Sequence, residues 1–118
     1  MNKVIRRNLE TIYSQVPADY YEKGVRTNFL QNIWNRRKWH NLDLLSFGPA
    51  PKKILDVGCA SGHISARLAR KFNQANVVGI DISDRFVGFA KKRHPRIKFL
   101  KADAHNLPFA AGYFDLVI

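Results

Sequence analysis

The chain has 118 residues, which is enough for one domain at most. Apolar residues make up 46% of it, but no apolar run approaches the roughly 18 residues that span a membrane. The formal charge of +11 is spread along the chain and fits either a solvated basic surface or an anionic partner such as RNA. The chain has a single cysteine, Cys59, so it cannot form an intrachain disulfide, which suits a reducing cytoplasm. No apolar segment follows the basic first residues, so we expect no secretory signal and a cytoplasmic protein.

The N-terminal part of the chain is predicted to be helical. Helices are expected over residues 3–14 and about 25–46, the second because apolar Val25, Phe29 and Ile33 recur every four positions and form one stripe. Four aromatic residues of this segment have two interpretations, packing on the core or lining a ligand site: Tyr20, Tyr21, Trp34 and Trp39.

A composition break at Gly48-Pro49-Ala50-Pro51 marks the boundary of this segment. Prolines there cannot continue a helix and favour an extended path. We therefore divide the chain into an N-terminal helical segment, residues 1–48, and an α/β domain, residues 49–118. The polar aromatic stretch at 19–22 is interpreted as a link between the two N-terminal helices.

Beyond the boundary, short apolar runs alternate with amphipathic stretches. Strands are predicted at 53–57, 76–81, 97–100 and 114–118, and helices at 63–73 and from an N-cap at Ser83 to a stop at Pro95. This alternation predicts right-handed βαβ units with a parallel sheet and flanking helices. The chain ends on an apolar run, so we expect the sheet to be truncated after its fourth strand and to belong to a longer protein.

A glycine-containing loop follows the first predicted strand, in the segment Asp56-Val57-Gly58-Cys59-Ala60-Ser61-Gly62. In an open α/β sheet, ligands bind at the carboxyl ends of the strands. Small residues there let the backbone approach a ligand closely. The N–H groups that begin the next helix favour a carboxylate or a phosphate, so this loop is the predicted ligand site.

Four motifs of residues 52–118 together resemble those of class I S-adenosylmethionine-dependent methyltransferases. They are Asp-Val-Gly-Cys-Ala-Ser-Gly at 56–62, Val-Gly-Ile-Asp-Ile-Ser at 78–83, Phe-Leu-Lys-Ala-Asp-Ala at 99–104 with Leu-Pro-Phe at 107–109, and Phe-Asp-Leu-Val-Ile at 114–118. The last set is most similar to the type 11 subgroup, which includes small-molecule methylases. The resemblance implies a Rossmann-like fold and an enzyme that uses S-adenosylmethionine as its cofactor.

The resemblance also assigns roles around the methionine portion of that cofactor. Asp56 would support the loop and reach the amino group, while Gly58, Ala60 and Gly62 would line the methionine portion. Ala60 departs from the family, which has a glycine here, and alanine adopts a positive φ less readily. Asp56 has a simpler interpretation as the cap of a turn.

Four further residues would hold the nucleoside. Asp81 would accept hydrogen bonds from both ribose hydroxyls, and Ile82 would pack on the adenine. Asp103 would accept from the adenine amino group, and the Ala104 N–H would donate to a ring nitrogen. The simpler interpretation of Asp81 and Asp103 is that they are solvated strand ends.

Other reactive side chains receive no role in the chemistry. Asp115 and the small Cys59 are interpreted as structural. His63 has two interpretations, a contact with cofactor or substrate and, more simply, a partly exposed residue of a first helical turn. No His/Cys spacing supports zinc, so no metal site is predicted. No catalytic residue is nominated, because methyl transfer needs a general base only where the acceptor must lose a proton.

Two other functions compete with the methyltransferase. A dinucleotide-binding domain also carries a glycine loop after its first strand, but the G-x-G-x-x-G pattern fails at Ala60 and His63. A non-catalytic module with the same fold would bind RNA or protein through its basic surface. For the enzyme, we expect a small-molecule acceptor, and the net charge leaves a nucleic acid open.

Overall fold

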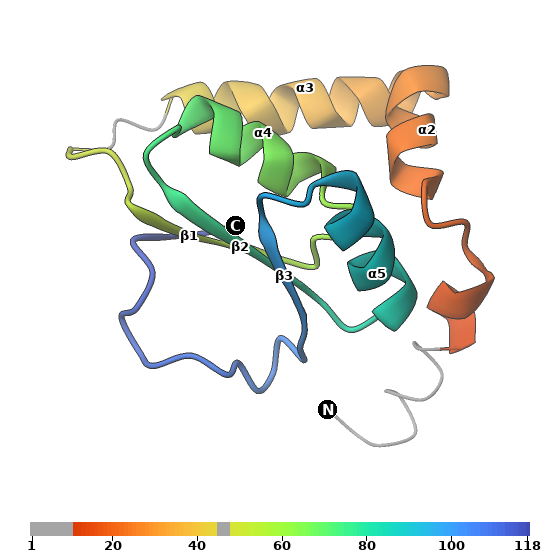
Figure 1. Cartoon of the computed structure of the whole chain (residues 1–118). Coiled ribbons are helices and arrows are strands. Elements are labelled where there is room, and N and C mark those ends of the chain that lie inside the picture. The colour runs from red at the N-terminus through yellow and green to blue at the C-terminus, as the bar shows by residue number, and fades with distance from the viewer. Residues whose placement is uncertain (1–10, 45–47) are drawn as a thin grey trace.

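A parallel sheet forms the centre of the part of the chain that the structure, a computed structural model, describes, residues 11–44 and 48–118 (Figure 1). Its strands are β1 (Lys53–Val57), β2 (Asn76–Asp81), β3 (Lys98–Lys101) and β4 (Leu116–Val117). They lie in the order β3-β2-β1-β4, and every neighbouring pair is parallel. The predicted parallel sheet is therefore confirmed, with the third strand displaced by one residue and the fourth shorter than expected.

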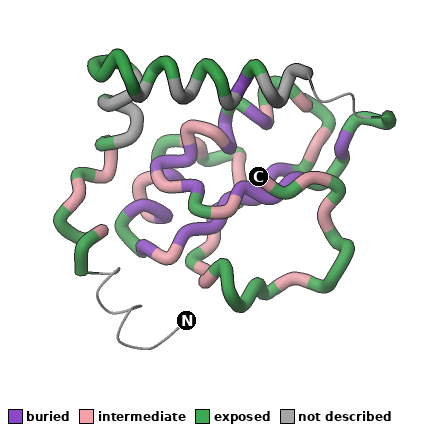
Figure 2. The backbone as a smooth tube through the Cα atoms, turned by 180° about the vertical axis from the view of Figure 1, so that it is seen from behind, coloured by how far each residue is buried: buried purple, intermediate pink, exposed green. Residues whose placement is uncertain are grey.

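Helices cover one face of the sheet, and residues of the segment between β3 and β4 cover the other. Ile54 and Val77 pack against Leu68 of α4 (His63–Lys71), and Phe99 packs against Val87 of α5 (Asp84–Arg93). On the opposite face, the partly buried Phe109 and Phe114 pack against three buried strand residues, Leu55, Val78 and Ile80. Because both faces are covered, the central strands are apolar on both sides, as parallel strands usually are. Figure 2 shows the buried residues concentrated in this layer.

The two helices that cover the sheet follow their predicted positions closely. Ser83 caps α5 by accepting a hydrogen bond from the Phe86 N–H at 3.4 Å, and α5 ends at Arg93, before Pro95. The other helix, α4, ends at Lys71 rather than at 73. Residues 102–115 contain no helix, so the alternation of strands and helices stops after β3.

Besides the backbone pairing of β4 with β1, the side chain of Asp115 links the start of β4 to the start of β1. Asp115 Oδ2 accepts hydrogen bonds from the Lys52 and Lys53 N–H groups, both at 2.9 Å. These two bonds lower the pKa of the Asp115 carboxyl. The structural interpretation of Asp115 agrees with this position.

The N-terminal helices differ from the prediction. One helix over 25–46 was expected, but α2 (Tyr20–Thr27) and α3 (Phe29–Leu44) flank a break at Asn28. The Asn28 Oδ1 accepts from the Leu30 N–H at 3.1 Å and so caps α3. The stretch at 19–22 is not a link, because Tyr20 begins α2. Of the helix expected over 3–14, residues 11–14 are helical, and the rest lies outside the described residues.

Where the structure describes the side chains of the predicted apolar stripe and its neighbours, they do not face the core. Phe29 and Leu30 are 77% and 75% exposed, and Ile33 is 39% exposed. Trp39 instead joins α3 to the core, because it is buried with Ile54, Leu68 and Val77, and the guanidinium of Arg67 lies 4.0 Å from its ring centroid. Core packing is thus confirmed for Trp39, whereas Tyr20 is exposed and the side chains of Tyr21 and Trp34 lie outside the described residues. Among the described helices, none has the length and apolarity needed to cross a bilayer.

Candidate functional site

The loop between β1 and α4 turns sharply at the carboxyl end of β1. Gly58 and Gly62 have φ values of +73° and +79°, and Ala60 reaches +45° despite its Cβ. That conformation costs an alanine about 1–2 kcal/mol. The N–H groups of Gly58 and Cys59 both donate to the Ile80 carbonyl, at 2.8 and 2.9 Å. Alanine thus takes up a positive φ in the middle of the loop, and the loop is held against the end of β2.

The ring of Phe99 lies directly under this loop. A Cβ placed on Gly62 would come within 2.7 Å of Phe99 Cζ, and one placed on Gly79 within 2.6 Å of Phe99 Cδ1. Both positions therefore require glycine for space, and Gly62 also requires it for its φ. The sequence analysis gave no role to Phe99 or Gly79, because a contact between distant segments leaves no local pattern.

Asp81 connects the loop to the end of β2. Its Oδ2 accepts from the Ala60 N–H and its Oδ1 from the Ser83 N–H, both at 2.9 Å. The side chain is 9% exposed, so it is not a solvated strand end. A carboxylate has about four acceptor sites, so two backbone donors leave capacity for two hydroxyl groups.

Asp56 belongs to β1, and its side chain lies buried against α4. It is 3% exposed, and its Oδ2 accepts from the Ser65 hydroxyl at 2.6 Å. This contact joins the strand before the loop to the helix after it, and the sequence analysis did not identify Ser65. The interpretation of Asp56 as a turn cap does not describe this contact, which runs from a strand to a helix.

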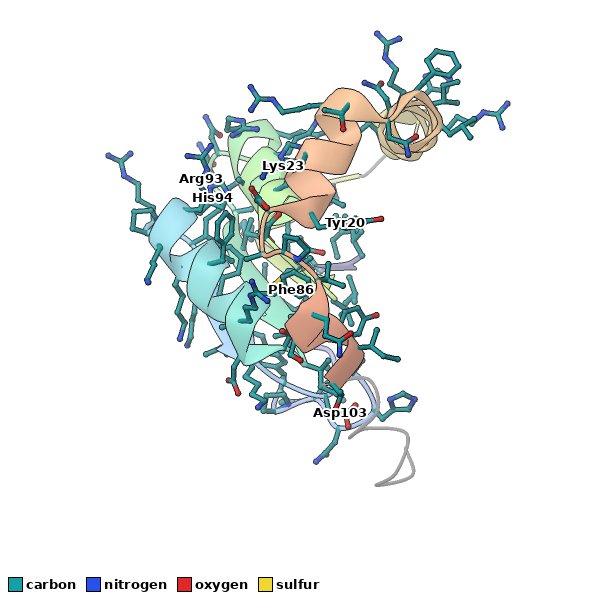
Figure 3. The ribbon with its side chains drawn as sticks, turned by 90° about the vertical axis from the view of Figure 1, so that its right-hand side faces the viewer. Tyr20, Lys23, Phe86, Arg93, His94 and Asp103 are labelled. Carbon is teal, nitrogen blue, oxygen red and sulfur yellow. The ribbon has the colours of Figure 1, made fainter. Side chains whose placement is uncertain are left out.

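Asp103 follows the end of β3. Its Oδ1 accepts from the His105 N–H at 2.9 Å and lies 3.2 Å from the His105 ring nitrogen Nδ1. Figure 3 shows Asp103 far from Arg93 and His94, which lie at the opposite end of the α/β layers. Of the two residues predicted beside the adenine, Ile82 is half-buried and Ala104 is exposed.

The predicted acidic residues therefore gather at one edge of the sheet. Asp56 and Asp81 lie near the carboxyl ends of β1 and β2, and Asp103 lies just past the end of β3. Since parallel strands share one carboxyl edge, all three carboxylates lie on the side of the sheet from which the loop emerges. This edge suits a ligand that carries positive charge and hydroxyl groups.

Cys59 lies within this acidic environment but is not activated. Burial raises the pKa of its thiol above the ordinary range, and the negative fields of Asp56 and Asp81 raise it further. A thiol in this state is a poor nucleophile and a poor metal ligand. Within the described ranges, no three His, Cys, Asp or Glu residues are grouped so as to hold a metal ion.

Comparison with known families gives one match that covers most of the α/β region. Residues 54–118 match the model of a family described as a methyltransferase domain. Among curated proteins, a malonyl-[acyl-carrier protein] O-methyltransferase of Legionella pneumophila is 35% identical over 103 residues, 85% of this chain and 34% of the relative. A fatty-acid O-methyltransferase of Mycolicibacterium smegmatis is 36% identical over 69 residues, 57% of this chain and 25% of the relative. The chain thus spans about a quarter to a third of the length of these relatives.

Solved structures show the same fold. The plantazolicin methyltransferase BpumL, in a complex with S-adenosylhomocysteine (SAH), aligns with a TM-score of 0.62 and 20% identity over 98% of this chain and 49% of that one. The [4+2]-cyclase SpnF aligns with a TM-score of 0.57 and 28% identity over 69% of this chain and 32% of that one. The predicted Rossmann-like fold is confirmed. The second likeness shows that one fold serves more than one chemistry, so function must be argued from the site.

Proposed function

Because this chain belongs to the methyltransferase domain family, we propose that it binds S-adenosylmethionine and directs its methyl group to a small-molecule acceptor. The observation that carries the proposal is the position of Asp56 and Asp81 beside the loop of Gly58 and Gly62, with Asp103 at the same edge of the sheet. The cofactor bears an ammonium, a sulfonium and two vicinal hydroxyls, which match a carboxylate-lined edge.

Each part of the cofactor has a candidate partner at this edge. Asp56 would attract the amino group, and the backbone at Gly58, Ala60 and Gly62 would line the methionine chain. The N-cap residue of α4 is Gly62, which has no side chain to cap the helix, and the first N–H groups of α4 would suit the cofactor's carboxylate.

The nucleoside would lie along the ends of β2 and β3. Asp81 would accept from both ribose hydroxyls while its bonds to the Ala60 and Ser83 N–H groups keep it oriented. Half-buried Ile82 would pack on the adenine. Asp103 would accept a hydrogen bond from the adenine amino group, and the Ala104 N–H would donate one to a ring nitrogen.

In this proposal the protein accelerates methyl transfer mainly by positioning the reacting groups. The cofactor supplies a methyl group that is already activated on a sulfonium. The loop and its carboxylates hold the reacting groups in line, which replaces a bimolecular encounter by a fixed geometry. Within the described part of the site, Cys59 is held as a thiol, and Asp56 and Asp81 accept hydrogen bonds from the Ser65 hydroxyl and the Ala60 N–H, so the role of these groups in the proposal is to hold the cofactor.

The named relatives indicate a class of acceptor for the proposal. Two relatives are named as O-methyltransferases of malonyl-[acyl-carrier protein] and of fatty acids. A carboxylate is already ionised at neutral pH and can attack a methyl group without losing a proton. We therefore include an acidic oxygen nucleophile on an acyl compound in the proposal. We also propose a cytoplasmic location and a division of the chain into a helical segment, residues 1–48, and an α/β domain, residues 49–118.

A second candidate function rests on the basic side chains. Arg70 and Lys71 end α4, and Lys91, Lys92 and Arg93 end α5. A non-catalytic module would use them to bind RNA. Cations at helix C-termini are also favoured by the helix dipole alone, so this observation is weaker than the carboxylate edge.

Ligand-dependent stabilisation tests the proposed cofactor. We expect SAH to raise the melting temperature of the protein, because a ligand at 100 times its Kd stabilises the folded state by about 2.7 kcal/mol. NAD, at the same concentration, should have no effect, because the loop lacks the dinucleotide pattern at Ala60 and His63. The assay is differential scanning fluorimetry over a ligand series. Stabilisation by NAD and not by SAH would overturn the proposal.

A further inference from the structure

We propose that Ser65 is a positioning residue that orients Asp56 toward the amino group of the bound cofactor. The proposal rests on the proposed function and adds a residue outside the family motifs described above. Its basis is one buried contact, in which the Ser65 hydroxyl donates to Asp56 Oδ2 at 2.6 Å. Neither side chain is on the surface, since Ser65 is 0% and Asp56 is 3% exposed.

This contact limits how the carboxylate can turn. The Cβ of Asp56 is fixed by β1, and one of the two carboxylate oxygens is fixed by Ser65. The direction of the other oxygen follows from these two constraints. A short bond to an ionised acceptor is also stronger than a bond between neutral groups, so it resists rotation.

Ser65 is itself held firmly in place. Leu68, almost one helical turn further along α4, is fully buried in the core with Ile54 and Val77. On the other side, Gly79 of β2 leaves the space in which the hydroxyl lies, because a Cβ there would come within 2.9 Å of Ser65 Oγ. The donor is therefore preorganised before any ligand arrives.

A purely structural role makes a different prediction. If Ser65 only ties α4 to β1, its loss would loosen the loop and weaken every ligand that uses the loop or its neighbours. If it orients Asp56, its loss should weaken only ligands that carry the amino group. Two ligands separate these cases: SAH carries the amino group, and 5′-methylthioadenosine keeps the thioether and nucleoside but lacks the amino-acid end.

The test measures both ligands by calorimetry on the protein and on Ser65→Ala. We expect the Kd for SAH to rise about tenfold, in line with the loss of one bond to a charged acceptor. The Kd for 5′-methylthioadenosine should stay within about twofold. Ser65→Thr keeps a hydroxyl at the same position and should restore most of the affinity for SAH.

A matched control uses the next residue of the same helix. Ala66→Gly weakens the buried face of α4 without removing the hydroxyl, so both ligands should be affected by the same factor. If Ser65→Ala also weakens both ligands equally, Ser65 only supports the structure and the proposal is wrong. If the unmodified protein binds neither ligand, the proposed function itself fails. Melting temperatures of all variants show whether each one folds.

Discussion

Gly62→Ala is expected to lower the free energy of unfolding by about 2–5 kcal/mol. Two costs add at this position. The φ of +79° costs an alanine about 1–2 kcal/mol. The new Cβ would also come within 2.7 Å of the Phe99 ring, and overpacking of this kind costs about 1–3 kcal/mol. Urea denaturation measures the sum.

Two other glycines separate the backbone cost from the packing cost. Gly58 has a similar φ of +73° but open space around its Cβ position, so Gly58→Ala should cost only the backbone contribution. Gly88 lies inside α5 with open space and no positive φ, so Gly88→Ala should stabilise the protein by about 0.5–1 kcal/mol. A Gly62→Ala variant no less stable than Gly58→Ala would show that Phe99 does not support the loop.

Asp81→Ala is expected to weaken SAH binding by at least tenfold. Hydrogen bonds to a charged acceptor contribute roughly 1.5–3 kcal/mol each, and the proposed ribose contact uses two of them. The same change removes the acceptor of the Ala60 N–H, so the loop loses a tether before any ligand binds. Isothermal calorimetry gives the affinity, and a melting curve gives the cost to the protein.

A neighbouring carboxylate provides the control for this change. Asp84 lies three residues further on, is exposed and pairs with Lys101. Asp84→Ala removes the same charge from the same part of the chain, and it should leave the SAH affinity within about twofold. An Asp81→Ala variant that binds SAH as tightly as Asp84→Ala would remove Asp81 from the site.

The sheet and the position of the loop could be predicted because their causes are local. Apolar runs such as 76–81 form central strands wherever both faces are covered. A loop of small residues directly after such a run lies at the carboxyl edge of the sheet by topology alone. The edge location of Asp56 and Asp81 follows from the same reasoning, whereas their roles toward a cofactor came from the resemblance.

The parts that sequence analysis missed depend on contacts between distant segments. Spacing shows that Phe29 and Ile33 share one face of a helix, but not whether anything covers that face. The break at Asn28 interrupts a pattern that continues across it, so periodicity gave one helix where the structure has two. The contact of Ser65 with Asp56 arises only when α4 packs on β1, and the close approach of Phe99 to Gly62 and Gly79 only when β3 pairs with β2.

An NMR titration of the isotopically labelled protein with SAH tests whether the carboxyl edge of the sheet binds the cofactor. We expect saturable shifts of the backbone amide signals at the loop and beyond the ends of β2 and β3, namely those of Gly58, Ala60, Gly62, Ser83 and Ala104. The amides at the basic end of α5, Lys91 to Arg93, should stay in place. Shifts confined to that basic end, or a loop that does not respond at saturating ligand, would contradict the assignment of the cofactor site.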